Sequence, residues 1–305
     1  MFNAPPVIET EVFASLPEQY RKKNQTAEWL RVQKRGMQTH SFLEGPSFDR
    51  HGNLYVTDIP YGRIFRISPA GDFTLVLEYD GEPNGLKLHA DGRIFIADHK
   101  QGILILDPVS GKLTVCLDRP RLERFKGVND LFFAANGDLY FTDQGQTGLQ
   151  DPSGRVYRYT AAGQLVCLMD NIPSPNGLVL APDEGSLLVA VTRANSVWRA
   201  PIRDDGTVSK VAAFLNLSGG FGPDGMALDA AGNLAVCHPG LGSVWLFSPE
   251  GEPVARVVSR TGKVVTNCAY GGPDGHWLYI TEADSGLVLR ARMPEPGRPM
   301  YHSPF

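Results

Sequence analysis

A short motif recurs six times along the 305-residue chain, at intervals of 40 to 48 residues. Each copy opens on a residue with an oxygen-bearing side chain and continues as a strand, a turn and a second strand. The six opening residues are Glu44, Asn84, Asn129, Asn176, Asp224 and Asn267. Repeats of this length and strand content are typical of β-propellers, in which each repeat builds one blade. The sequence therefore predicts an all-β, six-bladed β-propeller.

A propeller of this repeat length uses most of the chain, so we expect one domain over residues 1–305, with the blades over 44–293. The sixth repeat ends in a Pro-rich segment and lacks its outermost strand. Residues 7–16, with the sequence VIETEVFASL, are expected to supply that strand and close the ring, because closure removes a free sheet edge. Residues 17–43 contain a helix-like stretch, which we expect to form a short helical cap over one end of the channel.

The composition excludes several classes of function. A net charge of -4, with no long run of Lys or Arg, gives no basic surface for nucleic acid. No stretch approaches the roughly 20 apolar residues of a membrane span, and the start of the chain lacks the pattern of a signal peptide. Four cysteines without C-x-x-C spacing are expected to be reduced core thiols. We therefore expect a cytoplasmic protein that acts on small molecules, with its oligomeric state open.

If the first strand of each blade lines the central channel, the six opening residues meet at one mouth. Two carboxylates, Glu44 and Asp224, together with the amide oxygens of Asn129 and Asn176, form a set of hard oxygen ligands. Such a set suits Ca²⁺ first, and is open to Zn²⁺, Mg²⁺ or Mn²⁺. The alternative is that these Asn-Gly and Asp-Gly pairs are ordinary turns that need no metal. Six equivalent positions, two of them acidic, favour one divalent metal ion.

Several short motifs resemble the regucalcin/gluconolactonase family from about residue 44 to the end: EGP at 44–46, ND at 129–130, PNGL at 175–178, PDGMALD at 223–229 and TN at 266–267. The resemblance implies a six-bladed propeller with one divalent metal in its channel and hydrolysis of a sugar lactone. It implies that Glu44, Asn176 and Asp224 are metal ligands and that Asn129 binds metal or substrate. Members of animal type place an Arg two residues before this Asn, where this chain has Gly127 beside Lys126.

The expected reaction is metal-dependent opening of a lactone of a sugar acid or related hydroxy acid. The metal would polarise the carbonyl group, and Asp224 would accept a proton from the attacking water. His238 ends a second strand at the same mouth and is the second predicted catalytic residue. Besides Asn129, the predicted substrate contacts are Lys126, Arg193, His99 and Phe221.

Two other functions remain open at this point. The same metal could polarise a phosphoryl oxygen, which would give a phosphotriesterase-like hydrolase. Alternatively, the propeller could be a non-catalytic binding protein in which the metal only stabilises the fold. A structural metal should be fully coordinated by the protein, whereas a catalytic one should keep a position for water or substrate.

Overall fold

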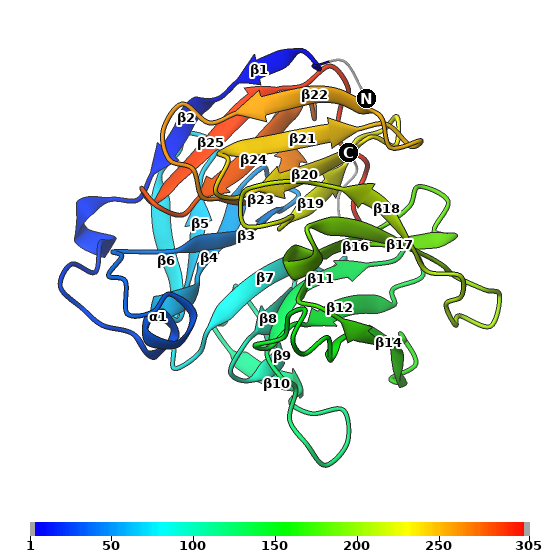
Figure 1. Cartoon of the computed structure of the whole chain (residues 1–305). Helices are drawn as coiled ribbons and strands as arrows, with labels where there is room; N and C mark the ends of the chain where they lie inside the picture. Colours follow the sequence, from blue (N-terminus) through cyan, green and yellow to red (C-terminus); the bar gives the residue numbers. More distant parts are fainter. Residues whose placement is uncertain (1–3, 302–305) are drawn as a thin grey trace.

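The computed structural model describes residues 4–301 and has six β-sheets arranged around a central channel, as Figure 1 shows. The predicted six-bladed propeller is thus confirmed. Within each blade the first strand lies innermost, and the following strands pair antiparallel with their predecessors.

The first three blades follow the repeat closely. Blade one contains β3 (Leu43–Phe48), β4 (Leu54–Asp58), β5 (Arg63–Ile67) and β6 (Phe73–Glu78). Blade two contains β7 (Pro83–Leu88), β8 (Ile94–Asp98), β9 (Gly102–Leu106) and β10 (Leu113–Leu117). Blade three contains β11 (Val128–Phe133), β12 (Leu139–Asp143), β13 (Gly154–Tyr159) and β14 (Leu165–Ile172).

The last three blades complete the ring. Blade four contains β15 (Pro175–Leu180), β16 (Ser186–Val191), β17 (Ser196–Pro201) and β18 (Ala212–Asn216). Blade five contains β19 (Met226–Leu228), β20 (Leu234–His238), β21 (Ser243–Phe247) and β22 (Pro253–Val258). Blade six contains β23 (Val265–Gly271), β24 (Trp277–Glu282) and β25 (Leu287–Arg292).

The N-terminal segment forms two strands where the sequence suggested one. β2 (Glu11–Ser15) pairs antiparallel with β25 and is the outermost strand of blade six. β1 (Val7–Glu9) instead pairs parallel with β22 and adds a fifth strand to blade five. The change of partner falls at Thr10, whose backbone N–H still donates to Val258 O. The segment therefore joins blades five and six at the outer edge of the propeller.

The core lies between the blades. The second strands β4, β8, β12 and β20 are buried along their whole length, as their runs of apolar residues favour, whereas no residue of the outer strand β10 is fully buried. The expectation of core thiols is right for Cys237 and Cys268, which are buried. It is wrong for Cys167, which is exposed on β14, and Cys116 on β10 is only half-buried. The outer strand of a blade has a solvent-facing side, and the short apolar run around Cys167 could not show which side it takes.

Residues 17–43 contain a 3₁₀ turn η1 (Glu18–Tyr20) and a single short helix α1 (Glu28–Gln33). Trp29 and Leu30 of α1 pack against Ile59 in the 3₁₀ turn η2 (Ile59–Tyr61) that follows β4. The helix ends at Gln33, with Lys34 as its C-cap residue, because Arg35 and Gly36 both adopt positive φ. A further 3₁₀ turn, η3 (Thr192–Ala194), follows β16. Within residues 4–301 no helix combines the length and the apolar character needed to cross a membrane.

Candidate active site

The six opening residues lie at the start of the innermost strands, at one mouth of the channel. Five of them are buried, at most 8% exposed, and Asp224 is half-buried in the loop before β19. At the ring positions of blades one, two, three, four and six, the pairing between the first and second strands shifts register. Such bulges free the bulged residues from regular pairing and redirect their side chains. We call these six residues the ring.

The glycine after a ring residue is required by a close contact between blades. A Cβ atom on Gly85 would lie 2.3 Å from Asp130 Oδ1, and one on Gly225 would lie 2.1 Å from Asn267 Oδ1. Interpreting the Asn-Gly pairs as turns is wrong for Asn84 and Asn176, because both residues lie inside strands. Close packing of neighbouring blades, rather than turn geometry, explains the repeated glycine.

Hydrogen bonds connect ring residues from different blades. Asn267 Nδ2 donates to Glu44 Oε2 over 2.9 Å and lies 3.4 Å from Asp130 Oδ2. The backbone N–H of Gly45 donates to the same Glu44 oxygen. Asn176 donates a side-chain hydrogen bond to Asp224. Blades one, three and six are therefore linked through the side chains of Glu44, Asp130 and Asn267, and blades four and five through those of Asn176 and Asp224.

The carboxyl groups of the ring are strongly affected by burial. Burial, followed by the charges of Asp224 and Asp130, raises the pKa of Glu44 well above its ordinary value. Burial also raises the pKa of Asp224 to about 7, and the Lys34 ammonium group opposes this shift. The pKa of Asp130 is raised by burial and lowered by Lys87, whose Nζ lies 3.9 Å from Asp130 Oδ1. A positive charge at the ring would relieve this repulsion, because it stabilises the ionised carboxylates.

The donor set is mixed. Among residues 4–301, no three His, Cys, Asp or Glu side chains are grouped as a metal site. A cation at the ring would therefore depend on the amide oxygens of Asn129 and Asn176 as well as on Glu44 and Asp224. Oxygen donors of this kind, two anionic and two neutral, are chemically compatible with a hard divalent ion.

A polar groove of about 360 Å³ lies beside the ring. Its walls include Gln33 from α1, Gln144 after β12, Ser174 before β15 and Arg193 in η3. Asn129 Nδ2 donates to Gln144 Oε1 over 2.9 Å, and Gln144 Nε2 donates to Ser174 Oγ over 3.0 Å. The groove thus continues from a ring residue to the surface through a chain of hydrogen-bonding side chains.

The predicted substrate residues surround this mouth at different depths. Arg193 lines the groove and is exposed. His99 is half-buried, its Nε2 lies 3.3 Å from Gln33 Nε2, and burial lowers its pKa to about 4. Lys126 is exposed and donates to Ser153 Oγ over 2.9 Å. Phe221 is 56% exposed in the loop before Asp224.

His238 lies at the end of β20 and is 1% exposed. Its Nε2 lies 2.9 Å from Gly219 O, and its buried Nδ1 has no hydrogen-bond partner within residues 4–301. Burial lowers the pKa of this imidazole. A Cβ atom on Gly220 would lie 2.7 Å from His238 Nε2, so the imidazole packs directly beneath the loop that leads to Asp224.

Three residues near the mouth were not among the predicted site residues: Lys34, Asp130 and Gln144. Lys34 is half-buried against the rings of Trp29 and Phe42, with its Nζ 5.5 and 4.3 Å from their centroids. Its position depends on how α1 folds, which no repeat predicts. Asp130 could have been found from the sequence, because it directly follows Asn129 in the ND motif. Gln144 could have been found because it follows Asp143 at the end of a second strand.

The fold and the ring define a class: a six-bladed propeller with a buried, acid-bearing polar site at one mouth of its channel. Residues 42–284 match the family model described as the SMP-30/Gluconolactonase/LRE-like region. The chain belongs to this family.

Two curated relatives carry names that state an activity. The chain is 30% identical over 281 residues to a gluconolactonase of Zymomonas mobilis, covering 82% of this chain and 78% of the relative. It is 32% identical over 246 residues to the lactonase drp35 of Staphylococcus aureus, covering 76% of this chain and 74% of that protein.

A solved structure shares the fold over almost its whole length. The calcium-binding protein regucalcin of Agrobacterium tumefaciens superposes with a TM-score of 0.76 at 23% identity, covering 97% of this chain and 99% of the other.

Proposed function

We propose that the protein is a metal-dependent lactonase, a carboxylic ester hydrolase that opens the ring of a sugar-acid lactone or related lactone. The observation that carries the proposal is the ring itself: the buried carboxyl group of Glu44 and the half-buried one of Asp224, both with raised pKa values, combined with amide oxygens beside a polar groove. The names of the relatives, gluconolactonase and lactonase, support the same reaction class.

We infer that Glu44, Asn129, Asn176 and Asp224 hold one divalent cation, with Ca²⁺ as the first candidate. The inference is supported by the hard oxygen donors and by the burial of carboxylates that would otherwise repel each other. A bound cation would supply Lewis acidity, which favours attack on the carbonyl carbon of an ester. The calcium-binding neighbour of the same fold is consistent with this choice of ion.

Asp224 is the proposed general base. With its pKa raised to about 7, Asp224 would be only partly ionised at neutral pH, and a bound cation would favour its ionised, basic form. The carboxylate would accept a proton from the attacking water and return it to the ring oxygen as the single bond between the acyl carbon and that oxygen breaks. The product would be a hydroxy acid, which releases a proton at neutral pH. Asn176, which donates to Asp224, would fix the orientation of that carboxylate.

The substrate would lie in the groove. Gln144 and Arg193 line it, and Asn129 adjoins it through its hydrogen bond to Gln144. Lys34 is the ammonium group whose charge acts most strongly on Asp224. We assign Lys34, Arg193, His99, Lys126 and Phe221 to substrate contact. His238 is assigned to the catalytic centre through its contact with the loop that carries Asp224. Four unpaired thiols, one of them exposed, favour a reducing compartment and hence the cytoplasm.

Proton release from a panel of five- and six-membered lactones, at neutral pH and with excess Ca²⁺, tests the proposal. We expect turnover of at least one sugar lactone. If a folded, Ca²⁺-loaded sample opens none of them, the lactonase assignment is wrong. Phosphotriesters in the same assay would then distinguish a phosphotriesterase-like hydrolase from a protein without hydrolase activity.

A further inference from the structure

Two positively charged side chains near the ring, those of Lys34 and Arg193, form no salt bridge and no side-chain hydrogen bond within residues 4–301. Lys34 is the C-cap residue of α1 and follows Gln33, which lines the polar groove. Arg193 lines the same groove from η3. Cations beside a polar groove that lack a protein partner can form charge-assisted hydrogen bonds to an anionic ligand.

The backbone of η3 is fixed against the loop that carries Asp224. Thr192 Oγ1 donates to Pro223 O over 2.7 Å, and Gly222 packs so closely on Thr192 O that a Cβ atom there would clash. Arg193 directly follows Thr192, so its side chain begins beside this loop. The guanidinium charge acts on Asp224 and lowers its pKa. Arg193 is therefore held at the mouth of the channel, next to the proposed general base.

Lys34 approaches the mouth from α1. Its Nζ lies 5.5 Å and 4.3 Å from the aromatic centroids of Trp29 and Phe42, and Phe42 stands two residues before Glu44. Burial lowers the pKa of Lys34, and the charge of Asp224 opposes this effect. Aromatic faces attract an ammonium group but give it no oxygen acceptor. The ammonium group has thus lost part of its hydration near the ring without gaining a carboxylate partner.

The charges around Lys34 leave an excess of one positive charge. The groups that act on its ammonium group are the carboxylates of Asp224, Asp284 and Glu44 and the guanidinium group of Arg193. In the proposed active form, a divalent cation balances Glu44 and Asp224. Of these groups, the exposed carboxylate of Asp284 is then the one negative charge left against Lys34 and Arg193. Two positive charges against one negative charge favour a ligand with one anionic group.

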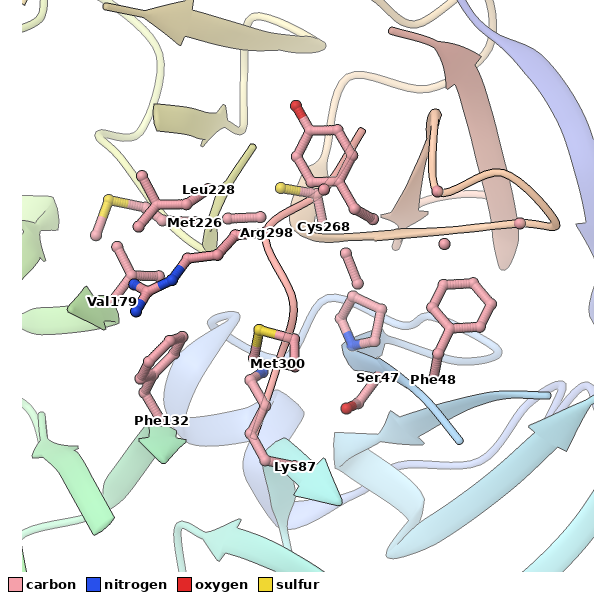
Figure 2. Close-up of a pocket in the computed structure, with 18 of the residues that line it drawn as sticks. Ser47, Phe48, Lys87, Phe132, Val179, Met226, Leu228, Cys268, Arg298 and Met300 are labelled. Atoms are coloured by element: carbon pink, nitrogen blue, oxygen red, sulfur yellow. The ribbon is translucent and has the colours of Figure 1, made fainter. Parts of the chain in front are cut away.

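The opposite half of the channel differs in its charges. Figure 2 shows its lining, which comes mainly from apolar side chains of the inner strands and from the C-terminal tail, defined here as residues 294–301. The two basic side chains in this lining already have carboxylate partners. Lys87 Nζ lies 3.9 Å from Asp130 Oδ1, and the Arg298 guanidinium group lies 3.5 Å from Glu184. The positive charge available to a ligand therefore lies at the ring end.

We propose that the substrate is a lactone that carries a carboxylate outside its cyclic ester, as the monolactone of a sugar dicarboxylic acid does. This inference rests on the proposed lactonase function. The carboxylate pairs with Lys34 and Arg193, and the guanidinium group can bind both of its oxygens. A carboxylate matches the single excess positive charge better than a phosphate ester, which carries about 1.5 to 2 negative charges at neutral pH. Gln144 and Ser174 in the groove suit the hydroxyl groups of the sugar chain.

Two five-membered lactones test the proposal: that of D-gluconic acid and the D-glucaric acid monolactone closed onto the same hydroxyl group. They differ only at the end of the chain, where the first has a hydroxymethyl group and the second a carboxylate. With Ca²⁺-loaded protein at low salt, we expect kcat/KM to be at least about tenfold higher for the glucaric acid lactone. Raising the ionic strength should reduce this ratio, because salt screens the exposed charges.

Arg193→Gln tests the source of the preference. The variant should fold, because the Arg193 side chain is exposed. It should lower kcat/KM for the glucaric acid lactone about tenfold more than for the gluconic acid lactone. Arg203→Gln is the matched control, since it removes the same charge from an exposed position in the turn between β17 and β18. This control should leave the ratio of the two kcat/KM values unchanged.

Equal kcat/KM values for the two lactones, or a ratio that Arg193→Gln leaves unchanged, would overturn the inference while the lactonase function stands. If the folded, Ca²⁺-loaded protein opens neither lactone, calorimetric titration with the same two lactones measures the charge preference without turnover. Tighter binding of the glucaric acid lactone, weakened in Arg193→Gln, would then support the anion site, and equal or absent binding would overturn it. The lactonase function itself is decided separately, by the wider panel of lactones.

Discussion

Asp224 is the residue on which the proposed chemistry depends most. Its backbone N–H donates to Cys237 O, Thr192 Oγ1 donates to the preceding Pro223 O, and its carboxylate accepts from Asn176. Three elements from blades four and five therefore fix one carboxyl group at the mouth. This support makes an isosteric substitution informative, since the surrounding contacts should survive it.

Asp224→Asn should lower kcat by about 10²- to 10⁴-fold, the range expected when a general base is removed. The measurement is lactone turnover with saturating Ca²⁺, together with circular dichroism to confirm the fold. Asp183→Asn, at an exposed turn of blade four, is the matched control and should keep full activity. Equal activity of the two variants would exclude Asp224 as the base.

Substitution of Lys34 tests whether residues 17–43, which contain α1, contribute to the proposed active site. Lys34→Met keeps the apolar stem against Trp29 and Phe42 but removes the ammonium group that acts on Asp224. We expect kcat/KM to fall by about tenfold, the effect of one lost hydrogen bond to a charged group. Lys23→Met, in the same segment but exposed, should change kcat/KM little. If both variants match the unmodified protein, Lys34 has no part in binding.

His99 makes stability depend on pH. Burial lowers its folded-state pKa from 6.5 to about 4, so between these values the unfolded chain binds a proton that the folded chain does not. The free energy of unfolding is therefore highest above pH 6.5, where His99 is uncharged in both states. It decreases as the pH falls toward 4, by up to about 3 kcal/mol. His99→Gln should therefore flatten the acid side of the stability curve from urea unfolding. Above pH 6.5, where His99 is uncharged in both states, the variant and the unmodified protein should show the same dependence of stability on pH.

At the scale of elements, threonine hydroxyl groups join successive blades next to the ring. Thr57 Oγ1 donates to Asn84 O, Thr142 Oγ1 to Asn176 O, and Thr266 Oγ1 to Leu43 O. Each bond runs from one blade to the inner strand of the next. The ring residues are thus held by both their own blade and its neighbour, which limits how far the mouth can widen.

The closing strand β2 should be necessary for stability. Ala14 on β2 is 5% exposed and packs in the core cluster of blades one and six, whereas Val12 on the same strand is 50% exposed. Ala14→Asp should lower the free energy of unfolding by more than about 3 kcal/mol, because it buries an unpaired carboxylate. Val12→Asp introduces the same group at an exposed position and should cost less than about 1 kcal/mol. Similar unfolding midpoints for both variants would contradict this role of β2.

At the scale of the whole molecule, the repeat makes the fold and the ring predictable from sequence. Equivalent positions in six blades must occupy equivalent places, so the repeat alone groups Glu44, Asn129, Asn176 and Asp224 at one mouth. The split of residues 7–16 between blades five and six could not be foreseen, because both halves are apolar enough to pair with either edge.

The residues that the sequence did not reveal lie mostly outside the repeat. Lys34 reaches the mouth from a six-residue helix whose position depends on the contacts of Trp29 and Leu30 with Ile59. Met300 reaches the opposite end from a tail without any repeat pattern. Tertiary contacts of single segments decide both placements, and no local pattern encodes them.

The channel therefore has two chemically different halves. The ring end is polar and acid-bearing, whereas the opposite end is apolar and covered by the C-terminal tail. We propose that one divalent cation, held on oxygen ligands at the ring end, makes the site an active lactonase.

The most direct test is a Ca²⁺ titration of chelator-treated protein, with lactone opening followed by proton release and the fold followed by circular dichroism. We predict that chelation abolishes turnover while the fold persists, and that activity returns in proportion to Ca²⁺ up to one equivalent, but not in Asp224→Asn. Full turnover by metal-free protein, or loss of the fold together with activity, would contradict a catalytic cation at the ring.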